Sequence, residues 1–196
     1  MNWKFVKSTV VLAFMSPPAV FGQAMPTATR NLQISGFSGM TATHMGAFSG
    51  GNVGVTAGVD LGFRSVYSLY PSLEVRGTYP LNNGQVDSEK NVLGGLKLAK
   101  VYGRFNPYAD LLFGRGQINY GAGYATPSGQ FYYVQSVSNV ISPGAGLDLH
   151  MTNQFSLKAD GQFQRYSSPV SDSGHAFSTA LTLGIVYRFG FRRQIR

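Results

Sequence analysis

Three histidines, His44, His150 and His175, are the residues of this chain best suited to acid–base or metal chemistry. Only His175 has nucleophiles nearby, because Ser173 and Ser178 flank it, and a histidine can activate a serine hydroxyl for acyl transfer. The other two lie in expected connections between strands, where surface histidines are ordinary. No histidine spacing resembles a metal site. The sequence therefore predicts no catalytic residue, no metal site and no cofactor.

A second set of chemically capable residues is charged, and its members recur at every second position. Glu74 and Arg76 are two apart, as are Lys158 and Asp160, and side chains two apart on a strand point to the same side. We expect the whole set to form a network of paired charges inside a barrel. Its members are Asp60, Glu74, Arg76, Lys97, Asp110, Asp148, Lys158, Asp160 and Arg188.

The stretches that carry these charges alternate apolar with small or polar residues, which is typical of β-strands. The pattern is clearest in residues 53–63 and 177–189. No sustained helical period or longer repeat is visible. Together with the weaker copies, the sequence predicts about eight antiparallel strands. The weaker copies are residues 32–40, 69–79, 92–98, 109–113, 141–149 and 155–163.

The expected connections alternate between short and long. Short turns are predicted at residues 64–70, 100–106 and 150–154, and they would share one side with both termini. Longer loops rich in Gly, Ser and Asn are predicted at residues 41–51, 80–91, 120–130 and 165–176. Pro143 cannot donate to a sheet, so it predicts a bulge or a late strand start. Arg115 falls on an apolar face and is expected near the outer membrane interface, where it can snorkel.

Composition separates a membrane barrel from a soluble one. Charged residues make up 12%, mean hydropathy is -0.03, and cysteine is absent. The charged set lies opposite the aliphatic face, and nine charges in the dry core of a soluble barrel would be severely desolvated. A soluble sandwich would be left with little charge elsewhere on its surface. The pattern favours an up-and-down transmembrane barrel with aliphatic residues facing lipid.

Residues 1–24 are predicted to be a secretory signal peptide. Lys4 and Lys7 precede a short apolar run, and cleavage is expected near Ala24, with Gly22 as the alternative. The expected organisation continues with a short segment (25–31), the barrel (32–189) and a basic periplasmic tail (190–196). The formal charge of +8 is scattered apart from that tail, so no nucleic-acid partner is expected.

The closing strand carries a pattern of the kind that the outer-membrane assembly machinery reads. Its spacing is polar, Gly, aromatic, aromatic, and Phe189 is followed by further residues. The residues that match are Thr182, Gly184, Tyr187 and Phe189.

With these motifs, the chain resembles the small bacterial outer-membrane barrels that include the OmpA transmembrane domain and OmpX. The resemblance rests on the segments GRFNPYAD (103–110), GAGLD (144–148) and FSLKAD (155–160) and on the closing strand. It implies an eight-stranded barrel and specifies little about activity. Lipid A deacylase barrels carry His-x-Ser, whereas this chain has His175 three residues before Ser178.

The function expected from the sequence is a monomeric, non-enzymatic barrel in the outer membrane, with a structural or surface-interaction role. Expected partners are outer-membrane lipid and lipopolysaccharide, the assembly machinery, and an extracellular ligand of the long loops that the sequence does not identify. A lipid A hydrolase and a narrow pore are the alternatives. Eight strands enclose space for little more than side chains, which disfavours a wide channel.

Overall fold

The structure, a computed structural model, describes residues 32–46, 50–81, 87–129 and 131–189. The chain divides into two units, residues 1–30 and 31–196, and only the second contains described residues. The predicted signal peptide, the segment 25–31 and the basic tail therefore lie outside the described residues. Within the described part of the chain, no helix is long and apolar enough to cross a membrane.

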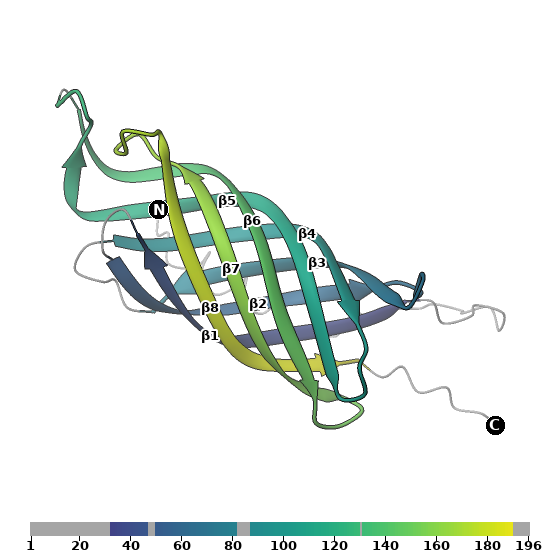
Figure 1. Cartoon of the computed structure of the whole chain (residues 1–196). Coiled ribbons are helices and arrows are strands. Elements are labelled where there is room, and N and C mark those ends of the chain that lie inside the picture. Colours follow the sequence, from purple (N-terminus) through teal and green to yellow (C-terminus); the bar gives the residue numbers. More distant parts are fainter. Residues whose placement is uncertain (1–31, 47–49, 82–86, 130, 190–196) are drawn as a thin grey trace, which may run out of the picture. The chain divides into compact units, whose positions relative to one another are not determined.

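Eight antiparallel strands form a closed barrel in which β1 pairs with β8 (Figure 1). The predicted fold is confirmed. The strands are β1 (Gln33–Met45), β2 (Gly50–Gly62), β3 (Leu69–Pro80), β4 (Asp87–Lys100), β5 (Phe105–Ala125), β6 (Tyr132–His150), β7 (Phe155–Ser167) and β8 (His175–Arg188).

The two ends of the barrel differ. One end, here called the termini end, holds the start of β1, the end of β8 and the turns 63–68, 101–104 and 151–154. At the opposite end, β5 and β6 run for 21 and 19 residues and project past the other strands (Figure 1). We call this the hairpin end, and residues 121–139 the projecting hairpin.

Strands extend into all four predicted long loops, so that part of the prediction is wrong. Residues 41–45, 87–91, 120–125 and 165–167 all lie in strands. In these segments the alternation of apolar and polar residues fades, although the backbone ladder continues. Asn91 pairs with Gly116, and Asp87 with Tyr120.

Pro143 also departs from its prediction. It lies within a continuous β6, opposite Leu111 of β5, and the register of β5 with β6 shifts instead between Asn119 and Tyr124. No residue of β7 pairs with Pro143. The missing N–H of proline therefore does not interrupt the ladder with β5.

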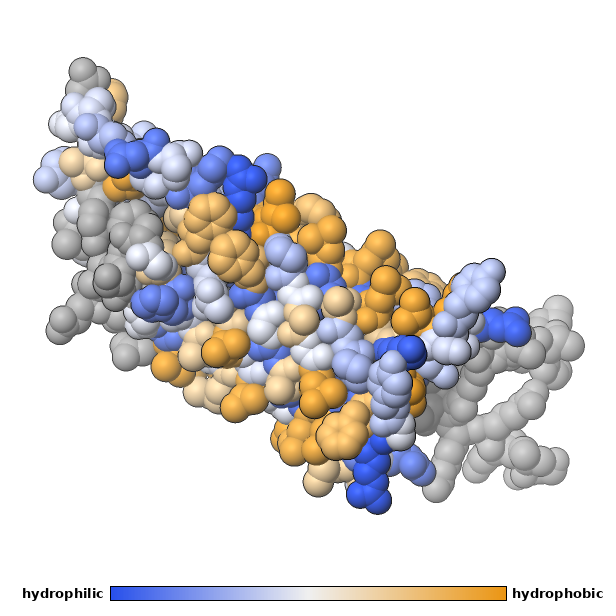
Figure 2. All heavy atoms as spheres, viewed as in Figure 1, coloured by the Kyte–Doolittle hydropathy of each residue, from blue (hydrophilic) through white to orange (hydrophobic). Residues whose placement is uncertain are grey.

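The barrel wall is apolar outside and polar inside. On β7, Ser156, Lys158 and Asp160 are buried, whereas Leu157 and Phe163 are exposed. Figure 2 shows apolar residues spread over the visible outer surface. Such a distribution is the reverse of a water-soluble protein.

Aromatic rings lie on the outer wall at two levels. Toward the hairpin end, the rings of Phe163 and Phe177 stack with their centroids 5.5 Å apart. At the termini end, the Tyr187 ring lies 5.1 Å from the rings of both Phe155 and Phe189. Two aromatic levels flanking an aliphatic band are typical of transmembrane barrels.

Gly184 lies at the seam that closes the barrel, directly opposite Gly39 of β1. A Cβ atom on Gly184 would collide with the β1 backbone at Ser38 and Gly39. This close approach gives Gly184 a packing role in addition to its place in the predicted assembly signal.

Candidate functional site

The barrel interior holds the largest collection of charged side chains. Alternation brings Glu74 and Arg76 inward from β3 and Lys158 and Asp160 inward from β7. Lys97 enters from β4, and the side chains of all five are at least 90% buried. Charges this deep in a protein need partners, because desolvation otherwise makes the charged form very costly.

Arg76 is the centre of this cluster. Its Nε donates to Glu74 Oε1 at 2.5 Å and its Nη1 to Asp160 Oδ1, also at 2.5 Å. A third carboxylate, Asp110, lies 3.6 Å from Nη2. Tyr108 adds a hydroxyl that donates to Asp160 Oδ2 at 2.8 Å. One planar guanidinium therefore joins carboxylates from β3, β5 and β7 across the lumen.

The two lysines connect this centre to the rest of the interior. Lys97 Nζ donates to Asp60 Oδ2 at 3.2 Å and to Asp148 Oδ2 at 3.4 Å. Lys158 Nζ lies 3.7 Å from Glu74 Oε2 and has no hydrogen-bond partner within the described residues. It sits over the Phe37 ring at 4.3 Å, a cation–π contact that replaces part of its hydration.

The structure brings eight of the nine predicted network residues into one cluster and separates the ninth. Arg188 points inward at the termini end, where its Nη2 donates to Ser156 Oγ at 2.7 Å. The ion pairs of β7 differ from those of β3, where Glu74 and Arg76 of the same strand bind each other. Asp160 binds Arg76, and Lys158 approaches Glu74, rather than the two pairing with each other.

A cluster of buried apolar residues occupies part of the lumen toward the hairpin end, which the sequence did not predict. Leu93, Leu112, Ile118, Val140 and Tyr166 are almost fully buried and form one contact cluster with several neighbours. We call this cluster the apolar plug. Its residues occupy inward positions, which elsewhere in the chain carry small or charged side chains. The alternation along each strand predicts that these side chains point inward, but it does not predict that they pack together.

One buried acid was missed. Glu89 lies on the inner face of β4, in a segment that the sequence placed in a loop, and accepts a hydrogen bond of 2.6 Å from Ser178 Oγ. Nearby, Asn91 Nδ2 donates to Gln164 Oε1 at 3.0 Å and to Tyr166 Oη at 2.9 Å. These polar contacts stabilise the wall around the plug.

At the termini end the lumen opens into a vestibule of about 720 Å³. Asp60, Lys97 and Asp148 form part of its lining, so the charge cluster closes its inner end. His150, predicted to be an ordinary surface residue in a turn, lies on the vestibule wall instead, with its Nδ1 2.7 Å from Asn106 Nδ2. It ends β6, and the strand extends one residue further than expected.

His175 does not contact a nucleophile. It lies on the outer face of β8, whereas Ser178, three residues on, points inward to Glu89. Its Nε2 is 2.5 Å from Arg165 Nη2, and Ser173 contacts only its backbone. Among the described residues, no group of three or more His, Cys, Asp or Glu side chains could hold a metal ion. The described geometry therefore offers neither a Ser–His pair nor a metal centre.

No protein-family model and no curated protein sequence matches the chain. Its fold is nevertheless shared with solved outer-membrane barrels. Neisserial surface protein A aligns over 81% of this chain and 97% of its own, with 12% identity and a TM-score of 0.51. The outer-membrane enzyme PagL aligns over 76% and 97%, with 14% identity and a TM-score of 0.50.

The attachment invasion locus protein Ail of Yersinia pestis also aligns, over 81% of this chain and 97% of its own, with 13% identity and a TM-score of 0.47. At such identities the comparisons show the fold alone: a closed, eight-stranded antiparallel barrel of the kind found in small outer-membrane proteins, to which the predicted resemblance pointed.

Proposed function

We propose that this chain is an outer-membrane barrel, closed to conduction, that contacts another protein at the cell surface through its projecting hairpin. The observation that carries the proposal is an open strand edge on that hairpin. The ladder of β6 with β7 begins at Val140, and the N–H of Ser167 in β7 donates to Ser138 Oγ. Beyond that contact, residues 132–137 of β6 pair with no described residue on the β7 side.

An open edge displays unpaired N–H and C=O groups, to which an extended strand of another protein can add. Most β-proteins protect such edges with charge or proline. Residues 132–137 contain neither. Tyr132 and Val134 are 76% and 70% exposed, respectively, and can supply apolar contacts beside the backbone pairing. The hairpin therefore fits an extended, uncharged segment of a partner protein.

The position of the barrel in the membrane follows from its wall and its ends. The aliphatic outer band matches lipid, and short turns at the end where the first strand begins and the last strand ends are the periplasmic arrangement of bacterial barrels. We therefore place the termini end in the periplasm and the hairpin end outside the cell. The predicted signal peptide fits this export.

Neither alternative function is supported by a specific contact. The charge cluster and the apolar plug fill the lumen between the vestibule and the hairpin end, so we propose no open pore. His175 lacks a hydroxyl nucleophile at its ring, so we propose no hydrolase activity.

The proposal is tested first by the location of the hairpin. The chain has no cysteine, so one introduced thiol can be labelled uniquely. We expect Ser128→Cys, in the hairpin turn, to react with a membrane-impermeant maleimide on intact cells. Asn153→Cys, in a turn at the termini end, should react only after the outer membrane is permeabilised. The reverse pattern would show that the barrel is inverted.

The role of the open edge is tested by adding charge to it. Val134→Lys and Tyr132→Lys should reduce the attachment of expressing cells to surfaces coated with extracellular proteins to the level of cells without the barrel. A lysine on an edge strand resists pairing with another strand. Thr152→Lys, at the other end, is the matched control and should leave attachment unchanged. Equal attachment by wild type and both edge variants would contradict the proposed role.

A further inference from the structure

A hollow in the outer wall is lined by an unusual combination of side chains. It has a volume of about 530 Å³ and lies across β2, β3, β4 and β5. Its floor is formed by two small residues on paired strands, since Ala57 lies opposite Gly77. Val55, Tyr79 and Val92 surround this floor.

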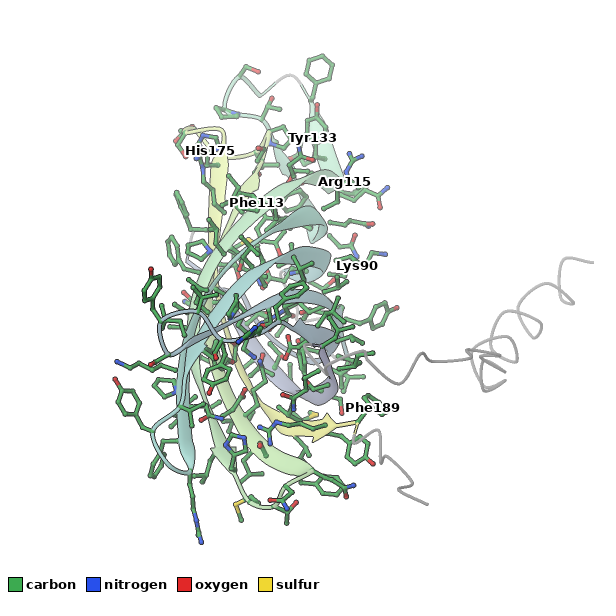
Figure 3. All side chains as sticks on the ribbon, turned by 90° about the vertical axis from the view of Figure 1, so that its right-hand side faces the viewer. Lys90, Phe113, Arg115, Tyr133, His175 and Phe189 are labelled. Atoms are coloured by element: carbon green, nitrogen blue, oxygen red, sulfur yellow. The ribbon has the colours of Figure 1, made fainter. Side chains whose placement is uncertain are left out.

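Two cations border the hollow on one side. On the neighbouring strands, Gly77 is paired with Val92 of β4, and Val92 is paired with Arg115 of β5. Lys90 is two residues from Val92 on the same face of β4, so it lies diagonally beside Arg115. Figure 3 shows both side chains projecting from the same side of the barrel wall, on its hairpin side relative to Phe189.

The two cations have no ion-pair partner among the described residues, whose ion pairs all lie in the interior cluster. A cation on the lipid-facing wall is costly unless it meets the headgroup region or an anion. An anionic group flanked by Lys90 and Arg115 would offset that cost. An apolar chain attached to the anion would lie in the hollow beside them.

From this juxtaposition we infer that the wall around Lys90, Arg115 and the Ala57–Gly77 floor is a binding site for a phosphorylated lipid of the outer leaflet. The phosphate lies between the two cations, and one acyl chain fills the hollow. The two cations match the charge of the phosphate, and the hollow matches the shape of the acyl chain. Such a site differs from the general lipid contact of a barrel, because it would discriminate lipids by their phosphate.

The barrel provides an internal comparison. A second outer hollow, of about 400 Å³, is lined by Pro143, Ala145, Gly161, Phe163 and Thr179 among others, with no charged side chain. Gly161 in this second hollow and Gly77 in the first can both accept a larger side chain. A Cβ atom added to Gly161 would lie 3.5 Å from Leu181 Cδ2, and a Cβ atom added to Gly77 would lie 3.8 Å from Asn91 O. Leucine at either glycine is therefore compatible with the fold and fills one hollow only.

The test uses the purified barrel in detergent micelles and counts bound lipid by native mass spectrometry. The probes are lipid A with its two phosphates and the same lipid A after dephosphorylation. We expect the wild type to bind the phosphorylated form at least about fivefold more tightly, as expected for basic residues near anionic lipid. Lys90→Gln combined with Arg115→Gln should abolish that preference. Gly77→Leu should weaken binding of both lipids, and Gly161→Leu should weaken neither.

Heat-modifiable gel mobility establishes that each variant is folded before binding is measured. Equal affinity of the wild type for the two lipids, or a preference that survives in the double variant, would overturn the inference. The site rests on the proposed membrane location but not on the hairpin's partner. A failed attachment experiment therefore leaves this site standing, and a failed lipid experiment leaves the hairpin proposal standing.

Discussion

Replacing Arg76 with alanine should destabilise the folded barrel by about 3–5 kcal/mol, the usual cost of leaving buried charges without their partner. Arg76 contacts Glu74, Asp110 and Asp160, so its removal leaves three buried carboxylates facing one another. The measurement is urea unfolding in lipid vesicles, with the folded fraction determined from heat-modifiable gel mobility. The only tryptophan, Trp3, lies in the predicted signal peptide, so tryptophan fluorescence is not a suitable probe of the barrel's unfolding.

A double-mutant cycle separates the ion pair from general packing. Glu74→Gln alone should also be costly, because Arg76, Lys97 and Lys158 all approach that carboxylate. The double variant should cost less than the sum of the single variants, since each removes the partner of the other. Arg188→Ala is the matched control. Arg188 is only partly buried and loses one hydrogen bond to Ser156, so its replacement should cost less than that of Arg76. Changes of only a few tenths of a kcal/mol at Arg76 and Glu74 would mean that the cluster is open to water.

Replacing Leu183 with arginine should cost about 2–4 kcal/mol in lipid, the penalty for a cation at the middle of a transmembrane barrel wall. Leu183 lies on β8 between the two aromatic levels and is 70% exposed. On the surface of a soluble protein, the same change would alter stability by about 0.5 kcal/mol or less. The two environments are therefore distinguishable from the free energy of unfolding of one variant.

His44→Arg provides the control for this change. His44 is exposed on β1 near the hairpin end, beyond the aliphatic band, so an arginine there should be almost neutral. If Leu183→Arg proved as mild as His44→Arg, the aliphatic wall would face water, and the barrel would not span a membrane.

The alternation in residues 53–63 and 177–189 was sufficient to predict the barrel, because it persists wherever one face meets an apolar environment. The same reasoning failed at the hairpin end. Segments such as 87–91 lie in strands whose two faces are both polar, and nothing in their pattern distinguishes a strand from a loop. The ladder with β5 keeps them extended, and that ladder is a long-range property.

The sequence could predict which charged side chains point into the barrel, but not which of them form ion pairs with each other. Period two identifies Arg76 and Asp160 as inward-facing, yet they are 84 residues apart in the chain. Whether Asp160 meets Arg76 or Lys158 depends on the register of every strand between them. For the same reason the sequence did not reveal the apolar plug, whose residues come together only when β4 to β8 and β1 are aligned.

We infer that the aliphatic wall faces lipid while the charges and the plug lie inside the barrel. Single cysteines placed along β8, each labelled with an environment-sensitive fluorophore, can be tested for quenching by lipid-attached quenchers in vesicles. Strong quenching is expected at Leu181, Leu183 and Ile185 and weak quenching at Ala180, Thr182 and Val186, because these two sets alternate between the outer and inner faces. Uniform quenching along the strand, or stronger quenching at the second set, would contradict this inference.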